Sequence, residues 1–291
     1  MNADKFKAHP GKSFSLADHD PRDTGDYKNK KMAKAQLQND IDQMADLQYK
    51  LYAENTRAIL IIFQAMDSAG KDSAIRHIMS GINPQGCEVF SFKAPSAEEL
   101  DHDYLWRHYS RLPERGRIGI FNRSHYENVL ITKVHPELLL RENLPGIRSV
   151  DDVKKGFWEK RYRQINDFER NLAENGVTIL KFFLHLSKKE QKKRFLERIE
   201  KADKHWKFSY ADIRERAFWD DYQSAYEAAI KHTSTDHAPW YIVPADHKWF
   251  SRVLIGNIIV STMEKMDIHI PEVTPEEKVL LEKGREALME E

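Results

Sequence analysis

The fold is decided by residues 58–73, which read AILIIFQAMDSAGKDS. The first six residues are a continuous apolar run, which is typical of a strand buried on both faces of a parallel sheet. Small residues then follow, and after them a Gly-Lys pair that opens a helical pattern. This order predicts a central strand, a tight turn and a helix that begins near Lys71.

Similar strand-like runs recur along the chain and alternate with helical patterns. The other runs lie at 89–92, 118–121, 178–184 and 240–243. Helices are expected at about 29–55, 71–81, 96–111, 124–133, 150–174, 187–200, 209–232 and 247–267. The alternation predicts an α/β fold with a central parallel sheet of about five strands, flanked by helices. We expect an extended arm over 1–28, open to packing on a neighbouring subunit, a main domain over 29–270, and a charged tail over 271–291.

Composition sets limits on partners and compartment. The 291 residues include 46 Lys and Arg against 46 Asp and Glu, so no overall field favours nucleic acid or a membrane surface. Any anion site must therefore be a local concentration of positive charge. The single cysteine, Cys87, allows no intramolecular disulfide, and no apolar segment resembles a secretory signal or a membrane span. We expect a cytoplasmic protein.

The turn after the first strand resembles a phosphate-binding loop. A standard loop has Gly, four residues, then Gly-Lys-Ser/Thr; here Ala65 replaces the first Gly and Asp72 follows the lysine. Small residues let backbone N–H groups approach phosphate oxygens, the helix adds its positive end, and Lys71 adds a charge. The residues expected to bind phosphate are Ala69, Gly70, Lys71, Asp72 and Ser73. Asp67 is interpreted as a Mg²⁺ ligand or proton acceptor, with a helix cap as the alternative.

A second group of polar residues follows the strand at 118–121. In open α/β sheets, ligands bind at the carboxyl ends of the strands. Asn122 occupies a position from which many P-loop proteins present an acid to the metal, and Glu127 follows one helical turn later. Arg123 is predicted to clamp a phosphate. The alternative is a helix cap with a surface ion pair, and Tyr126 is interpreted equally as core packing or pocket lining.

A basic stretch near 190–215 predicts a lid. Arg194, Arg198 and Lys201 share one helix face by their spacing, as a site for a polyanion would need. The polar turn after them holds two aromatic residues, which fits a mobile segment that closes over a site and excludes water. A solvated helix face is the simpler interpretation for Lys188, Lys189 and Lys192.

At this point the sequence resembles the polyphosphate kinase 2 family over roughly residues 30–270. The resemblance rests on segments in the family's order: AMDSAGKDS at 65–73, NPQG at 83–86, FKAP at 92–95, HDYLWR at 102–107, FNRSHYE at 121–127, KFFLH at 181–185 and WKFS at 206–209. It implies a three-layer P-loop kinase fold with a helical lid, similar to thymidylate kinase. It also implies transfer of the terminal phosphoryl group of inorganic polyphosphate to a nucleotide, assisted by Mg²⁺ or Mn²⁺.

The resemblance also assigns residues. It implies that Asp67 binds the metal and helps to activate the acceptor, that Lys71 and Arg123 hold phosphates, and that Arg194 and Arg198 act from the lid. Many members carry Asp where this chain has Asn122, which is a further candidate metal ligand here, and Lys93 is a further candidate for phosphate binding. Asn122 with Glu127 resembles the class III subgroup, which phosphorylates both nucleoside mono- and diphosphates. Expected nucleotide contacts are Arg107, Asn122, Tyr126 and Glu127, with Trp106 a further candidate for the base. Family members are often homo-oligomers, so a dimer or tetramer is expected.

Two other functions are compatible with the same residues. An ATP-dependent nucleoside or nucleotide kinase would share the fold, although ATP needs only a few of the lid's charges. A non-catalytic module that binds polyanions or nucleotides would gain nothing from a carboxylate inside its loop, which argues against it.

Overall fold

The structure is a computed structural model that describes residues 1–291. Its sheet has six strands in the order β1-β6-β5-β2-β4-β3, and β2 to β6 are mutually parallel. The parallel strands are β2 (Ala58–Ala65), β3 (Cys87–Ser91), β4 (Ile118–Asn122), β5 (Val177–His185) and β6 (Trp240–Pro244). The five predicted strands are confirmed, and β2 is buried along its whole length, as its apolar run predicted.

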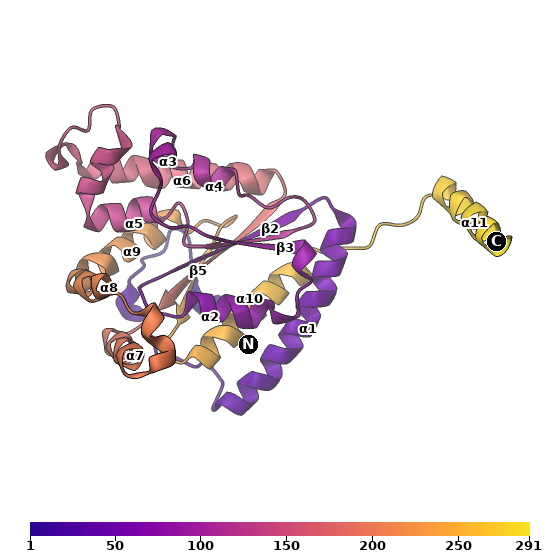
Figure 1. Cartoon of the computed structure of the whole chain (residues 1–291), viewed down its shortest axis with the longest axis horizontal. Coiled ribbons are helices and arrows are strands. Elements are labelled where there is room, and N and C mark those ends of the chain that lie inside the picture. The colour runs from indigo at the N-terminus through magenta and orange to yellow at the C-terminus, as the bar shows by residue number, and fades with distance from the viewer.

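Helices cover both faces of the sheet and make three layers (Figure 1). One face carries α1 (Lys30–Glu54), α2 (Lys71–Ile78) and α10 (Lys248–Lys265). The other carries α5 (Glu127–Val134), α6 (Lys155–Glu174) and α9 (Trp219–Thr233). Because side chains alternate along a strand, Ile59 and Ile61 of β2 enter the first core while Leu60 and Ile62 enter the second. Each such buried side chain contributes about 1.5–3 kcal/mol of burial free energy.

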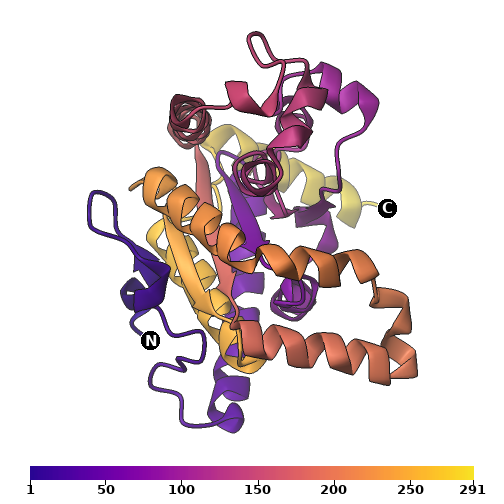
Figure 2. The same cartoon turned by 90° about the vertical axis from the view of Figure 1, so that its left-hand side faces the viewer.

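Two expected helices are broken into shorter pieces. The stretch predicted as a helix at 96–111 contains α3 (Ala97–Asp101) and α4 (Trp106–Tyr109). The stretch at 209–232 contains α8 (Tyr210–Glu215), a single 3-10 turn, Arg216–Phe218, and then α9. Figure 2 shows the predicted lid as a hairpin, in which α7 (Lys188–Glu200) leads away from the sheet and α8 and α9 return towards it. A 3-10 turn, Ala202–Lys207, makes the bend.

The arm at the start of the chain packs on its own chain. Residues Lys7–Ala8 form β1, which pairs antiparallel with β6 at the edge of the sheet. Phe6 and Leu16 are buried in the two cores. The sequence had suggested an extended arm, open to packing on a neighbouring subunit. In the structure the backbone of β1 pairs with β6 and so covers an edge that would otherwise be open.

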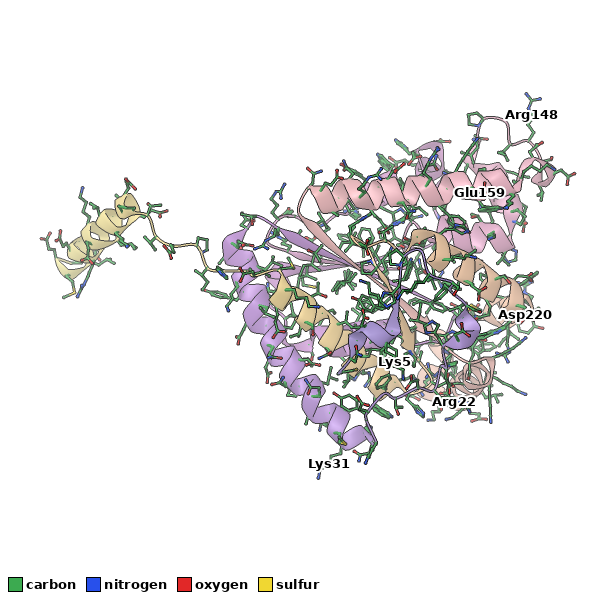
Figure 3. All side chains as sticks on the ribbon, turned by 180° about the vertical axis from the view of Figure 1, so that it is seen from behind. Lys5, Arg22, Lys31, Arg148, Glu159 and Asp220 are labelled. Carbon is green, nitrogen blue, oxygen red and sulfur yellow. The ribbon has the colours of Figure 1, made fainter.

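The last helix, α11 (Pro275–Met289), stands apart from the body beyond an extended linker and has no buried residue (Figure 1). The structure thus has an exposed helix within 271–291, where the sequence suggested an exposed helix or a tail. Charged side chains elsewhere also project outward, as Lys31, Glu159 and Asp220 do in Figure 3. None of the helices combines the length and hydropathy that crossing a bilayer requires.

Candidate active site

The turn between β2 and α2 has the geometry of a phosphate loop. Ser68 and Gly70 both have positive φ, 67° and 107° respectively. At Gly70 a side chain would be strained by the backbone, so glycine is required there. The helix that follows begins at Lys71, and its first N–H groups have no acceptor within the helix. The loop therefore offers backbone donors and the positive end of a helix at one point.

Lys71 lies at the base of this loop. Its Nζ donates to the carbonyl oxygen of Ala65 at 3.3 Å, which leaves donors for a ligand. Burial lowers the pKa of Lys71, and the nearby Arg123 lowers it further. A poorly solvated ammonium group in this position gains more from binding an anion than an exposed lysine does.

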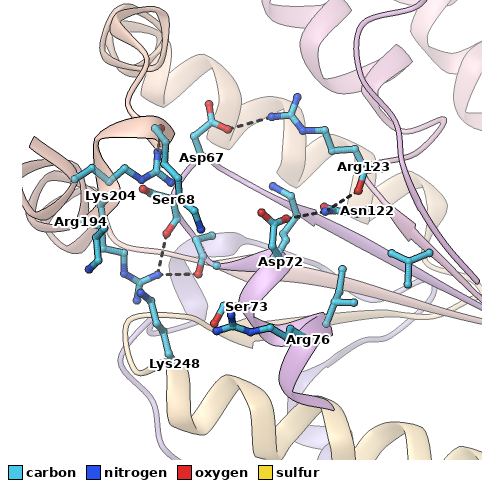
Figure 4. Close-up of a pocket in the computed structure, with 18 of the residues that line it drawn as sticks. Asp67, Ser68, Asp72, Ser73, Arg76, Asn122, Arg123, Arg194, Lys204 and Lys248 are labelled. Atoms are coloured by element: carbon cyan, nitrogen blue, oxygen red, sulfur yellow. Dashed lines mark hydrogen bonds and ion pairs between the residues drawn. The ribbon is translucent and has the colours of Figure 1, made fainter. Parts of the chain in front are cut away.

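Arg123 connects the two strand ends. Its guanidinium group lies 3.2 Å from Asp67 Oδ1 (Figure 4). It also lies 3.7 Å from Glu127 Oε2. Glu127 and Asp67 raise the pKa of Arg123, whereas burial opposes them. Burial raises the pKa of Glu127, although Arg123 and Lys71 act against it. The two acids and two cations form one network around the mouth of the phosphate loop.

Asn122 reaches the same place from the end of β4. Its Nδ2 donates to Asp72 Oδ1 at 2.7 Å and to Ser91 Oγ at 3.3 Å, so its amide oxygen is the atom left for a ligand. Asp67, Asp72 and Asn122 line one cleft, but no group of three His, Cys, Asp or Glu side chains forms a closed metal cage. Mg²⁺ is commonly held by one or two carboxylates with water and substrate phosphates, so this open oxygen set fits it.

These residues line a cleft of about 760 Å³. Positive charge dominates its walls, with nine Lys or Arg side chains: Lys71, Arg76, Lys93, Arg123, Arg194, Arg198, Lys204, Lys207 and Lys248. Only three acidic side chains face them: Asp67, Asp72 and Glu197. In a chain with equal numbers of acids and bases, this excess marks an anion site.

The comparison with known proteins agrees with this geometry. The family model described as Polyphosphate kinase 2 (PPK2) matches residues 27–271. The chain belongs to the polyphosphate kinase 2 family. It is 50% identical, over 98% of both chains, to a Rhodopseudomonas palustris protein named ADP-polyphosphate phosphotransferase. It is 43% identical to a Meiothermus ruber protein named AMP/ADP-polyphosphate phosphotransferase, over 96% of this chain and 99% of that one.

A solved structure shows that the similarity extends to the fold. The crystal structure of polyphosphate kinase 2 from Arthrobacter aurescens TC1 superposes with a TM-score of 0.86 at 39% identity, covering 97% of this chain and 96% of that chain. The predicted family and fold class are thus confirmed. Among the residues expected for such a polyphosphate kinase 2 site, the structure brings together Asp67, Ala69–Ser73, Lys93, Asn122, Arg123, Arg194 and Arg198.

Tyr126 does not belong to this group, and its expected nucleotide contact is wrong. The side chain is fully buried on the far side of the sheet. Its hydroxyl donates to Glu169 at 2.8 Å and accepts from Lys181 Nζ at 2.8 Å, while Lys181 pairs with Glu169 at 2.5 Å. A buried lysine and glutamate need such partners, so Tyr126 serves the core.

Lys201 also lies outside the cleft. The helix ends at Glu200, and Lys201 takes an extended backbone (φ −100°, ψ 116°) that breaks the helical spacing on which the prediction depended. Its exposed ammonium group reaches only Glu197, at 4.0 Å. Lys204 and Lys207 of the bend line the cleft instead.

Outside the lid, three more cations that sequence reasoning did not select lie at this site. Arg76 comes from α2, and Lys248 opens α10. Arg252, one turn later, donates from Nη2 to Ser73 Oγ at 2.8 Å. Lys248 follows the end of β6 closely, so the rule that ligands bind at strand ends could have found it. Arg76 and Arg252 lie inside helices and carry no motif.

A second, smaller cavity of about 200 Å³ adjoins the cleft. The two share Phe92, Lys93, Ala94 and Arg123. Arg107 also lines the small cavity: its Nη2 donates to the carbonyl oxygen of Lys93 at 2.9 Å, and its guanidinium lies over the ring of Phe92. Trp106 does not line this cavity, although its ring stacks on His102, which does.

Proposed function

We propose that this chain transfers the terminal phosphoryl group of inorganic polyphosphate, reversibly, to nucleoside mono- and diphosphates such as AMP, ADP, GMP and GDP. The observation that carries the proposal is the cleft with nine cationic and three acidic side chains, joined to a phosphate loop. The two relatives named ADP-polyphosphate phosphotransferase and AMP/ADP-polyphosphate phosphotransferase support the same chemistry.

The cations favour a long donor. They come from separate elements: α2, the strand ends, the lid and α10. A nucleoside triphosphate occupies three phosphate positions, and the loop with Lys71 and Arg123 can serve those alone. Arg76, Lys204, Lys207 and Lys248 extend the positive surface beyond them, as a chain of many phosphates requires. This extension favours polyphosphate over ATP as the donor.

The smaller cavity is suited to the acceptor. Two of the residues that line it, Tyr104 and Asn128, each have a buried side-chain oxygen with no hydrogen-bond partner in the protein. Such atoms cost free energy unless a ligand or water satisfies them. We assign the base and ribose to this cavity, so that the acceptor phosphate reaches Arg123 at the shared wall. Glu127 and Arg107 line the same cavity.

Asp67 and Asn122 would hold Mg²⁺, or Mn²⁺ in its place, in contact with the phosphates. A bound divalent ion supplies charge neutralisation for phosphoryl transfer. The protein's own part is to fix the geometry: the loop amides and Lys71 bind the donor phosphate, and Arg123 aligns the acceptor. Arg198 reaches the cleft from the lid, which would exclude water when closed.

A donor comparison tests the proposal. The chain is incubated with AMP or ADP, Mg²⁺ and either polyphosphate or ATP, and ADP and ATP formation is followed by chromatography. Polyphosphate should support turnover, and a chelator should abolish it. If only ATP serves as donor, the chain is an ATP-dependent kinase. If polyphosphate binds and no donor gives product, it is a binding module.

A further inference from the structure

The first turns of the lid helix hold the phosphate loop through two side chains. Gln191 of α7 donates from Nε2 to the carbonyl oxygen of Asp67 at 3.0 Å. Arg194, one turn later, donates from Nη1 to the carbonyl oxygens of Ser68 and Ala69, at 3.0 and 2.7 Å (Figure 4). Three successive loop carbonyls are therefore bound by one helix.

The remaining donors of Arg194 are also occupied. Its Nη2 donates to the carbonyl oxygens of Ala245 and Asp246, at 2.6 and 3.1 Å, and its Nε donates to Glu190 at 3.0 Å. An arginine has five N–H donors, and all five have acceptors here. The residue is 5% exposed. It cannot bind phosphate without giving up contacts that hold the loop.

Arg198 has fewer hydrogen-bond partners than Arg194 and is more exposed. Its Nη1 lies 3.3 Å from Asp212 and 3.5 Å from the carbonyl oxygen of Lys207, and the side chain is 21% exposed. The two arginines of one helix thus have different surroundings. Arg198 keeps donors for a ligand, whereas Arg194 is fixed in the protein.

Binding of these carbonyls orients the loop amides. In a trans peptide the C=O of one residue points opposite to the N–H of the next. With the carbonyls of Asp67 and Ala69 directed at α7, the N–H groups of Ser68 and Gly70 point away from it, where a phosphate over the start of α2 can reach them. Gln191 is itself oriented by Arg216, whose Nη1 donates to its Oε1 at 2.7 Å.

We propose that Gln191 and Arg194 are positioning residues that hold the phosphate loop in its anion-binding form, and that Arg194 does not contact the transferred phosphoryl group. The inference rests on the proposed phosphate-binding role of the loop. The family resemblance had placed Arg194 among the arginines that act on the substrate from the lid.

Hydrogen–deuterium exchange of the ligand-free chain tests it without any assumption about substrates. Arg194→Ala, Arg194→Lys and Gln191→Leu should each raise exchange at least tenfold in peptides covering 64–73 and leave α1 and α6 unchanged. Lys192→Ala, on the exposed side of the same helix, is the matched control and should behave as wild type. Unchanged loop exchange in Arg194→Ala would overturn the inference.

Turnover with polyphosphate separates positioning from direct contact. A lysine keeps the charge but cannot reach four carbonyls, so Arg194→Lys should lose as much kcat as Arg194→Ala. Gln191→Leu removes no charge and should lower kcat more than tenfold as well. If Arg194→Lys retains near-wild-type kcat, Arg194 acts by its charge and the inference is wrong. If the Arg194 variants do not fold, Gln191→Leu tests the inference by the same two measurements, exchange in the loop and kcat; wild-type values of both would contradict it.

Discussion

Arg123 Nη2 lies 3.2 Å from Asp67 Oδ1, which joins the end of β4 to the phosphate loop after β2. The pair places a carboxylate among cations, where it would repel phosphate unless a metal ion or Arg123 balanced it. Under the proposed function a divalent ion would balance Asp67 together with Arg123, and this would explain the acidic residue in the loop.

Asp67→Asn tests this explanation. The amide keeps the size and a hydrogen-bonding oxygen but loses the charge that favours Mg²⁺. We expect kcat to fall at least a hundredfold, about 2.7 kcal/mol of transition-state free energy, and the Mg²⁺ concentration for half-maximal rate to rise. Polyphosphate binding, measured by calorimetry without metal, should persist. Asp42→Asn on the exposed face of α1 is the control, and an equal kcat for the two variants would contradict the assignment.

Arg198 and Lys201 form a matched pair on the lid, because only Arg198 lines the cleft. Arg198→Ala should raise the KM for polyphosphate about tenfold, which corresponds to about 1.4 kcal/mol, and change the KM for the nucleotide much less. Lys201→Ala should leave both unchanged. Steady-state kinetics with each substrate varied in turn measure the two KM values. An equal rise in both KM values for Arg198→Ala would show that Arg198 does not act specifically on polyphosphate.

Tyr126→Phe should affect stability and spare binding. Losing the hydroxyl leaves the buried Glu169 and Lys181 with one partner fewer, which costs about 1–3 kcal/mol. Urea unfolding should show this loss, and the KM for AMP and ADP should stay at the wild-type value. Tyr49→Phe, at an exposed position of α1, should cost nothing. A raised nucleotide KM with unchanged stability would return Tyr126 to the site.

Two buried histidines predict acid sensitivity. Burial lowers the pKa of His108 to about 2 and that of His185 to about 4, from an ordinary value of 6.5. Between these values and 6.5 the unfolded chain binds more protons than the folded one, so stability falls as pH falls. Between pH 7.5 and pH 5.0 each of the two histidines should lower the free energy of unfolding by about 2 kcal/mol. Urea titrations at both pH values measure the loss.

The variant His108→Phe should reduce that pH dependence, since the ring already packs among Phe92 and Phe121 and the replacement cannot be protonated. The comparison is between the two slopes of unfolding free energy against pH. An unchanged slope in the variant would show that His108 is not the group responsible.

The sequence predicted the central strands β2, β4 and β5 because they are buried along all or most of their length, which requires continuous apolar runs. A continuous apolar run such as 58–63, followed by a turn with Gly-Lys and then a helical pattern, is hard to interpret as anything other than a buried strand. The phosphate loop and the polar residues after β4 were found for a related reason, since strand ends converge at one edge of a sheet. The strands and the residues at their ends can be recognised from short stretches of sequence.

The sequence did not predict features that depend on the direction of a side chain or on contacts between residues far apart in the chain. Arg123 takes a positive φ of 66°, and the chain turns there, so Tyr126 enters the far core although Arg123 faces the cleft. The lid helix stops one residue before Lys201. Arg76 and Lys248 come to the cleft from helices far apart in the chain. Only the folded structure brings them together.

The proposed function depends above all on the loop and Lys71, which would hold the phosphate that reacts. Lys71→Ala removes a preorganised charge at the transition state, which costs about 3–4 kcal/mol, or two to three orders of magnitude in rate. The most direct measurement is kcat for this variant with saturating polyphosphate and ADP, after circular dichroism has confirmed its fold. We predict a fall of at least a hundredfold. Turnover within threefold of wild type would contradict the claim.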